Sequence, residues 1–328
     1  MVKQILPLLM LLSVPALAAK PALTVYTYDS FSAEWGPGPA VKKAFEAQCG
    51  CELRYVALED GVSLLNRVRM EGKNSKADVV LGLDNNLLQA AQQTGLFAKS
   101  EVDFHSLTLP GGWQDQTFVP FDYGYFAFVY DKTRLKNPPT SLKELVESPE
   151  KWRVIYEDPR TSTPGLGLLL WMQKVYGDSA PQAWQKLAQK TVTVTKGWSE
   201  AYGLFLKGEG DLVLSYTTSP AYHLIEEKKE NYAAAPFAEG HYLQVEVAAQ
   251  LAGSKQPKLA QQFMQFMLTP AFQNAIPTGN WMYPVIKSEL PAGFQTLSVP
   301  QTALQYSPQQ VAQQRAEWIN AWQRAVSR

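Results

Sequence analysis

Short apolar runs alternate with helical patterns along most of this chain. Between the runs, apolar residues recur at the three- and four-residue spacing of one helix face, as at Val41, Ala44 and Phe45 after Pro39. The runs predict strands at 23–28, 53–57, 77–83, 154–156, 191–195 and 211–216. Helices are expected from Pro39, Leu64, Ser141, Pro257 and Ser307. This alternation is typical of an α/β protein whose sheets are largely parallel.

Two longer apolar stretches, 118–130 and 241–251, are expected to be strands that cross between two lobes. Two crossings imply a hinge between discontinuous domains, near 123–125 and 236–242. We therefore expect one lobe from 19–123 plus 240–290 and a second lobe from 124–239. The C-terminal helical segment 291–328 is not assigned to either lobe.

The last helix has a clear start and a clear apolar face. Ser307 and Gln310 have the spacing of a capping box, with Pro308 at the first helical position. The apolar stripe of this helix is Val311, Trp318, Trp322 and Val326. Both tryptophans are therefore expected in the core and not in a binding site.

The first residues have the pattern of a secretory signal. Lys3 makes a short basic start, 5–14 is almost wholly apolar, and Ala16-Leu17-Ala18 has the small-x-small form that signal peptidase cleaves. An N-terminal core helix is the alternative. The apolar run is too short to span a bilayer, which needs ~20 residues, so we expect a signal peptide at 1–18 and a mature protein in the periplasm.

The charges balance, because Lys plus Arg and Asp plus Glu each number 30 among 328 residues. A chain without a positive excess is a poor candidate for nucleic-acid binding. The two cysteines, Cys49 and Cys51, could close a very small disulfide ring, but spacing does not decide whether they do. We expect no metal site, since His105, His223 and His241 fall in no ligand spacing.

The loop 158–165 precedes an apolar helix and carries Ser162 and Thr163. A helix N-terminus presents free N–H groups and a partial positive charge, which suit a phosphate or carboxylate. Ordinary N-capping by either hydroxyl is the alternative interpretation. No nucleotide-binding loop, nucleophile elbow or zinc-protease motif accompanies it in the sequence.

Several other loops at expected strand ends combine aromatic rings with hydroxyl groups, and the segment with Trp281 lacks the clean period of a core stripe. These candidates are Tyr28, Trp35, Trp198, Tyr216, Thr217, Thr218, Ser219 and Trp281. Ligands bind at the carboxyl ends of strands in open α/β folds. Rings from both lobes would form a cleft for a flat cation, each face contributing ~0.5 to 2 kcal/mol. A buried tryptophan beside a capping serine is the alternative for each loop.

At these residues the chain resembles the periplasmic thiamine-binding proteins of bacterial ABC importers, a family of type II solute-binding proteins. The resemblance extends over the mature chain and includes the segments 26–31, 58–61, 158–165, 196–200, 215–220 and 277–281. It implies a two-lobed fold that closes on thiamine, thiamine phosphate or thiamine diphosphate in the interlobe cleft. The ligand would pass to an inner-membrane permease driven by a cytoplasmic ATPase.

The resemblance also implies which residues contact the ligand. They are Asp60, Gly61, Ser162, Thr163, Trp198, Tyr216, Thr217, Thr218 and Ser219, with Tyr28, Trp35, Tyr222 and Trp281 as ring partners. Asp60 would face the cationic thiazolium, and the Ser162 helix terminus would face a phosphate ester. We expect no cofactor, no catalysis and a monomer.

Two alternatives stay open on the sequence. Thiamine-cleaving enzymes of the thiaminase I type resemble this fold and use a cysteine nucleophile, which would need an activated thiol near the cleft. Ferric-ion binders of the same fold type need clustered tyrosine, histidine and carboxylate ligands. Cys49 and Cys51 precede an expected strand, and Tyr216 has no tyrosine beside it.

Overall fold

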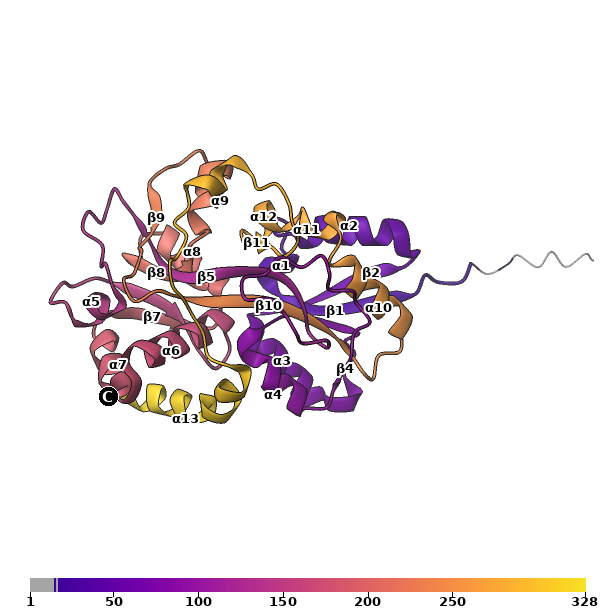
Figure 1. Cartoon of the computed structure of the whole chain (residues 1–328), viewed down its shortest axis with the longest axis horizontal. Coiled ribbons are helices and arrows are strands. Elements are labelled where there is room, and N and C mark those ends of the chain that lie inside the picture. Colours follow the sequence, from indigo (N-terminus) through magenta and orange to yellow (C-terminus); the bar gives the residue numbers. More distant parts are fainter. Residues whose placement is uncertain (1–14, 16) are drawn as a thin grey trace, which may run out of the picture.

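The computed structural model describes residue 15 and residues 17–328. They form a mixed sheet with the strand order β2-β1-β3-β10-β5-β8-β6-β7, covered by helices (Figure 1). The signal segment predicted for 1–18 lies, apart from residues 15, 17 and 18, outside the described residues. Among the described helices, none combines the length and the apolar character that crossing a membrane requires.

The strands of the described residues are β1 (Ala22–Tyr28), β2 (Glu52–Leu58), β3 (Val79–Asp84), β4 (Phe97–Ala98), β5 (Val119–Asp131), β6 (Val154–Glu157), β7 (Thr191–Thr195), β8 (Leu212–Tyr216), β9 (Tyr232–Ala234), β10 (His241–Leu251), β11 (Tyr283–Pro284) and β12 (Ala303–Leu304). The α-helices are α1 (Asp29–Ser32), α2 (Gly38–Cys49), α3 (Gly61–Glu71), α4 (Leu88–Gln93), α5 (Leu142–Glu147), α6 (Thr163–Tyr176), α7 (Ala180–Ala188), α8 (Trp198–Leu206), α9 (Ser219–Glu226), α10 (Pro257–Phe266), α11 (Pro270–Gln273), α12 (Ile276–Gly279) and α13 (Pro308–Val326). Short 3-10 turns are η1 (Gly72–Asn74), η2 (Asn85–Leu87), η3 (Gly177–Ser179) and η4 (Ala292–Thr296).

The first lobe is built on the parallel strands β2, β1 and β3. Every residue of β3 is buried, as expected for a parallel strand with both faces covered. Helix α3 packs on β1 and β3, while α2 packs on β2. The three predicted strands of this lobe are therefore confirmed.

The second lobe repeats the arrangement with the parallel strands β8, β6 and β7. Helix α6 lies against β5, β6, β8 and β10 and is buried from Thr163 to Met172. A helix that is apolar on all sides belongs in an interior, which explains the run of leucines in 166–170.

The two long strands β5 and β10 join the lobes, and their predicted ranges are confirmed within a residue or so. From Val119 to Tyr125, β5 pairs with β10, and from Phe126 onward it pairs with β8 and β9. All these pairings are antiparallel, as is that of β10 with β3. The strands within each lobe are thus parallel, and the antiparallel pairings are those made by the connecting strands β5 and β10.

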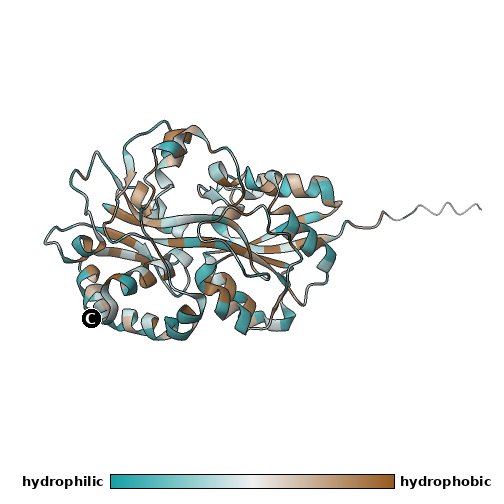
Figure 2. Ribbon diagram, in the orientation of Figure 1, coloured by the Kyte–Doolittle hydropathy of each residue, from teal (hydrophilic) through white to brown (hydrophobic). Residues whose placement is uncertain are grey.

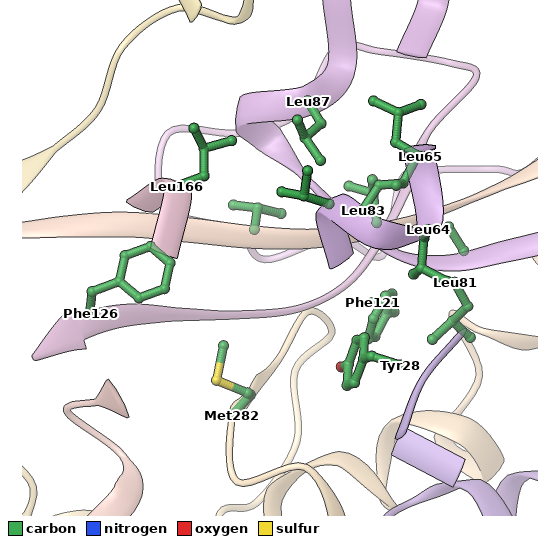
Figure 3. Close-up of a cluster of buried hydrophobic side chains, with 14 of the residues drawn as sticks. Tyr28, Leu64, Leu65, Leu81, Leu83, Leu87, Phe121, Phe126, Leu166 and Met282 are labelled. Carbon is green, nitrogen blue, oxygen red and sulfur yellow. The ribbon is translucent and has the colours of Figure 1, made fainter. Parts of the chain in front are cut away.

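One hydrophobic core runs through both lobes beneath these connecting strands. Figure 3 shows Leu64 and Leu65 of α3 close to Leu81 and Leu83 of β3, with Phe126 of β5 near Leu166 of α6. Figure 2 shows hydrophobic residues concentrated along the strands and hydrophilic ones along the outer helices. The lobes therefore share one core at the crossing strands.

Helix α13 contacts both lobes. It packs against α6 and α7 of the second lobe and against α4 and η2 of the first (Figure 1). The predicted capping box of Ser307 and Gln310 is present. Trp322 is buried and its Nε1 donates to the Tyr156 hydroxyl at 3.1 Å, so this tryptophan is a core residue as predicted.

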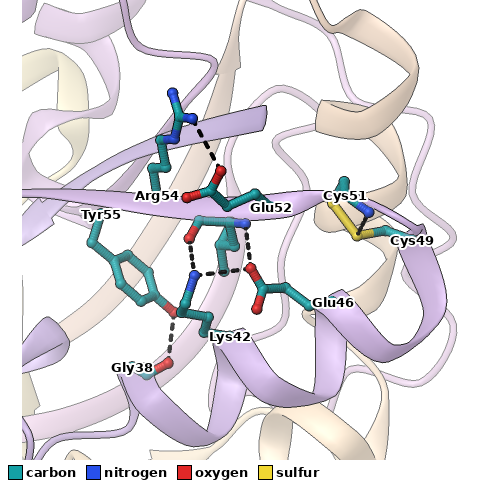
Figure 4. A network of polar contacts seen from close by, with 9 residues as sticks. Gly38, Lys42, Glu46, Cys49, Cys51, Glu52, Arg54 and Tyr55 are labelled. Carbon is teal, nitrogen blue, oxygen red and sulfur yellow. Dashed lines mark hydrogen bonds and ion pairs between the residues drawn. A yellow bond between two sulfur atoms is a disulfide. The ribbon is translucent and has the colours of Figure 1, made fainter. Parts of the chain in front are cut away.

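A disulfide joins Cys49 and Cys51 at the end of α2, where Gly50 has a φ of 60° (Figure 4). Nearby, Lys42 donates to the Leu53 carbonyl at 2.6 Å, and Leu53 N–H donates to Glu46 at 2.8 Å. These contacts tie α2 to β2. The structure thereby decides the pairing that spacing alone left open.

Candidate functional site

A cavity of about 350 Å³ lies where the two lobes meet. Its lining comes from β1, the start of α3 and the α12–β11 loop in one lobe, and from the starts of α6, α8 and α9 in the other. Most of the predicted site residues line it: Tyr28, Trp35, Asp60, Thr163, Trp198, Tyr216, Ser219, Tyr222 and Trp281. The loops that were singled out for rings and hydroxyls therefore do converge.

The other predicted residues, Gly61, Ser162, Thr217 and Thr218, are buried beside the cavity and do not line it. Ser162 is the N-cap of α6, since its hydroxyl accepts from the Gly165 N–H at 3.1 Å. Thr218 donates to the carbonyl of Trp281 at 2.5 Å and so fixes the loop that carries this ring. The structure thus supports the capping interpretation of Ser162.

Asp60 is the point where three helices meet. Its Oδ1 accepts from Gly61 N–H at 2.7 Å and from the Thr163 hydroxyl at 3.2 Å, while Oδ2 accepts from Trp198 N–H at 3.0 Å. The N-termini of α3, α6 and α8 therefore share one carboxylate. Burial raises the pKa of Asp60 to about 6, although these hydrogen bonds act to lower it.

These contacts differ from the expected role of Asp60, which was to face the cation of a ligand. Its oxygens are directed to backbone and hydroxyl donors, and the side chain is only 5% exposed. Since Asp60 belongs to the first lobe and Thr163 and Trp198 to the second, the carboxylate connects the lobes. Ser63 N–H, which donates to the Thr161 carbonyl at 2.9 Å, adds to the same contact.

Close approach of the lobes here requires glycine. A Cβ on Gly197 would lie 2.5 Å from the carbonyl oxygen of Glu59, and one on Gly61 would overlap Thr163. Gly197 has φ −151° and ψ 171°, an extended conformation open to any residue. Its lack of a side chain is therefore needed for the contact between lobes and not for the backbone.

Aromatic rings form the walls of the cavity. Trp198 stacks on Tyr202 with ring centroids 5.0 Å apart, and Trp35 lies 6.4 Å from Trp198. On the other side, Tyr222 meets Trp281 edge to face at 5.4 Å. Trp35 is 55% exposed and stands at the rim. Rings thus line the cavity from both lobes.

Tyr202 and Glu246 line the cavity but were not predicted. Tyr202 follows Trp198 by one helical turn, so i, i+4 spacing could have found it. Its hydroxyl is 2.8 Å from His223 Nε2, which holds the ring in place. Glu246 lies within the apolar strand β10, where an isolated carboxylate was the available signal.

The lining has acidic groups and no basic ones. It includes the carboxyl groups of Asp29, Glu59, Asp60 and Glu246, and no lysine, arginine or histidine among the described residues. Within the same residues there is no cluster of three or more histidine, cysteine or acidic side chains arranged to hold a metal. A flat, positively charged organic molecule is the ligand class that this cavity complements.

Residues 36–274 match the family of bacterial extracellular solute-binding proteins. The chain belongs to this family. It is 77% identical over 328 residues to the thiamine-binding periplasmic protein of Salmonella typhimurium, covering 100% of both chains. A solved structure of a periplasmic thiamin binding protein matches with a TM-score of 0.93 and 79% identity, covering 94% of this chain and 97% of that one.

Solved structures with much lower sequence identity share the fold of this chain. Iron-bound HitA from Pseudomonas aeruginosa matches with a TM-score of 0.76 at 22% identity, covering 93% of this chain and 99% of that chain. The predicted two-lobed type II fold is therefore confirmed. At this identity the likeness extends to the fold alone.

Proposed function

We propose that this protein captures thiamine or its phosphate esters in the periplasm and delivers them to the inner-membrane permease of an ABC importer, which a cytoplasmic ATPase drives. The observation that carries the proposal is the cavity between the lobes, which combines aromatic walls with carboxylates and has no basic side chain in its described lining. Full-length relatives named as thiamine-binding periplasmic proteins support the choice of ligand.

The chemistry of thiamine matches this cavity. Its thiazolium ring is a cation and its aminopyrimidine is flat, so both can lie against ring faces such as those of Trp198 and Trp281. A cavity of about 350 Å³ falls in the usual range for small-molecule sites. Two or three ring contacts at ~0.5 to 2 kcal/mol each would supply a substantial share of the ~8 kcal/mol that micromolar affinity requires.

A phosphate ester would be directed to the meeting point of α3, α6 and α8. The N–H groups at these helix starts suit an anion, and the Asp60 carboxylate accepts from two of them in this structure. An ester would therefore compete with Asp60 for the Gly61 and Trp198 donors. Comparing thiamine with thiamine phosphate by calorimetry measures the outcome of that competition.

Binding without catalysis is the other part of the proposal. A thiaminase-like reaction would need a free thiol at the cleft, whereas Cys49 and Cys51 form a disulfide and do not line the cavity. We also propose that the protein acts as a monomer. Binding and delivery require no cofactor, because thiamine is the transported ligand.

Native mass spectrometry of the purified mature protein tests the ligand directly, because it needs no assumption about substrate class. A retained mass equal to thiamine or one of its phosphates is expected, and chromatography after long incubation should return it unaltered. Calorimetry on protein stripped by unfolding and refolding should then give a one-to-one complex. Absence of thiamine binding in that titration, or release of free pyrimidine and thiazole, would refute the proposal.

A further inference from the structure

Three carboxyl groups lie side by side across the strands that join the lobes. In the backbone register, Glu246 of β10 is paired with Asp84 of β3 on one side and with Asp122 of β5 on the other. All three side chains are buried, and Glu246 alone of the three lines the cavity. Like charges directly opposite each other destabilise a sheet, so this row needs an explanation.

The hydrogen bonds of Asp122 and Glu246 converge on one amide. Asn280 Nδ2 donates to Asp122 Oδ2 at 2.6 Å and to Glu246 Oε2 at 3.2 Å, and the Tyr28 hydroxyl donates to Glu246 Oε2 at 3.1 Å. Asp122 Oδ1 is buried and has no hydrogen-bond partner among the described residues. The two carboxyl groups therefore face the same small space from neighbouring strands.

Within the described residues, no cationic side chain forms an ion pair with either group. The ion pairs found in the described part of the chain include neither Asp122 nor Glu246. The titratable groups that face the pair from the surrounding strands are acidic or phenolic: Tyr28 of β1, Asp84 of β3 and Tyr216 of β8. The site therefore contains negative charge that the protein itself does not neutralise.

Two adjacent buried carboxylates do not both ionise readily, and a shared proton relieves their repulsion. Burial raises the pKa of Asp122 to about 6. Burial first, and then the charge of Asp122, raises the pKa of Glu246 well above its ordinary value. A proton shared by the two groups would relieve this repulsion in the empty site, and a cation placed against Glu246 would favour the departure of that proton.

We propose that Asp122 and Glu246 are the counter-charge for the cationic ring of the bound ligand, sharing a proton when the cavity is empty and releasing it to solvent when the cation enters. Asp60 is unsuited to this role because three helix N-termini already occupy its oxygens. The inference rests on the proposed function, since it requires a cationic ligand. It assigns recognition of charge to the connecting strands and not to the loops.

Calorimetry with thiamine at pH 7, in buffers of different ionisation enthalpy, measures the released proton. Release approaching one proton per thiamine is expected for the unmodified protein. An uncharged analogue, in which carbon replaces the thiazolium nitrogen, should bind without this release. These two titrations need no variant and therefore do not depend on how a substitution affects folding.

Variants then locate the proton. Glu246→Gln should abolish the release and reduce the preference for thiamine over the uncharged analogue at least tenfold, and Asp122→Asn should act in the same direction. Glu157→Gln is the matched control, because Glu157 is another fully buried carboxyl group, outside the cavity lining and in the second lobe. It should leave both the release and the preference unchanged.

The outcomes separate the two proposals. If thiamine binds with no proton release and Glu246→Gln keeps the full preference for the cation, the acid pair is not the counter-charge, while the proposed function stands. If the control removes the preference as strongly as Glu246→Gln does, the assignment to this pair is wrong. If neither thiamine nor the analogue binds, the proposed function itself fails and this inference fails with it.

Discussion

Replacing Gly197 by alanine tests whether contact between the lobes contributes to affinity. The added Cβ would lie 2.5 Å from the Glu59 carbonyl oxygen, and ordinary contact begins near 3.4 Å, so the two segments must separate by about 0.9 Å. The neighbouring hydrogen bond from Trp198 N–H to Asp60, now 3.0 Å, would lengthen by a similar amount and be lost.

The size of the effect follows from that bond. A hydrogen bond to a charged group contributes ~1.5 to 3 kcal/mol, which corresponds to roughly a tenfold to hundredfold weaker affinity. The resemblance implies that the lobes lie apart without ligand, and in that state stability should not fall, because the extended backbone at Gly197 accepts alanine and the substitution lowers the entropy of the unfolded chain. We therefore expect weaker thiamine binding with an unchanged or slightly higher melting temperature in the absence of ligand.

Isothermal calorimetry gives the affinity, and a thermal melt without thiamine gives the stability. Gly253→Ala is the control, since the nearest atom to its Cβ would be the Lys73 carbonyl oxygen at 3.8 Å, an ordinary contact. That variant should bind like the unmodified protein. An undiminished affinity of Gly197→Ala would refute the reasoning, because it would mean that the lobes do not approach this closely in the complex.

Three further predictions concern stability and the neighbourhood of the site. Burial raises the pKa of Asp84 from 3.8 to about 6, so its contribution to stability is full only below about pH 3.8 and is lost as the pH rises through 6. The free energy of unfolding of the unmodified protein should thus fall by ~2.4 kcal/mol relative to Asp84→Asn between pH 4 and pH 7.5, and parallel pH profiles would contradict this. Ser162→Ala should lower the free energy of unfolding in urea by ~1 kcal/mol, because an N-cap is lost. Any loss of affinity should be equal for thiamine and thiamine phosphate. A selective loss of affinity for the phosphate would instead make Ser162 a ligand contact. Replacing Cys49 and Cys51 together by serine should leave thiamine affinity unchanged in calorimetry, because the disulfide lies outside the cavity lining, and a tenfold loss would show that the site depends on it.

Local patterns in the sequence were sufficient for most secondary structure. The run 191–195 and the stretch 241–251 have the same limits in the structure, and the capping box at Ser307 begins α13. These features depend on residues near one another in the chain, namely apolar periodicity and the donors at a helix start. The same is true of the loops with Trp198 and Tyr216, which could be recognised as strand ends bearing rings.

What only the tertiary structure decided is the role of each carboxylate. Asp60 looked like a partner for a cation, yet its oxygens are taken by helix starts in two lobes. Glu246 was hidden in an apolar strand, where alternation does not reveal which face meets a cavity. Its pairing with Asp122 depends on the register of two strands that are more than a hundred residues apart in the chain. Such pairing is set by how β5 and β10 pack together, and no local pattern encodes it.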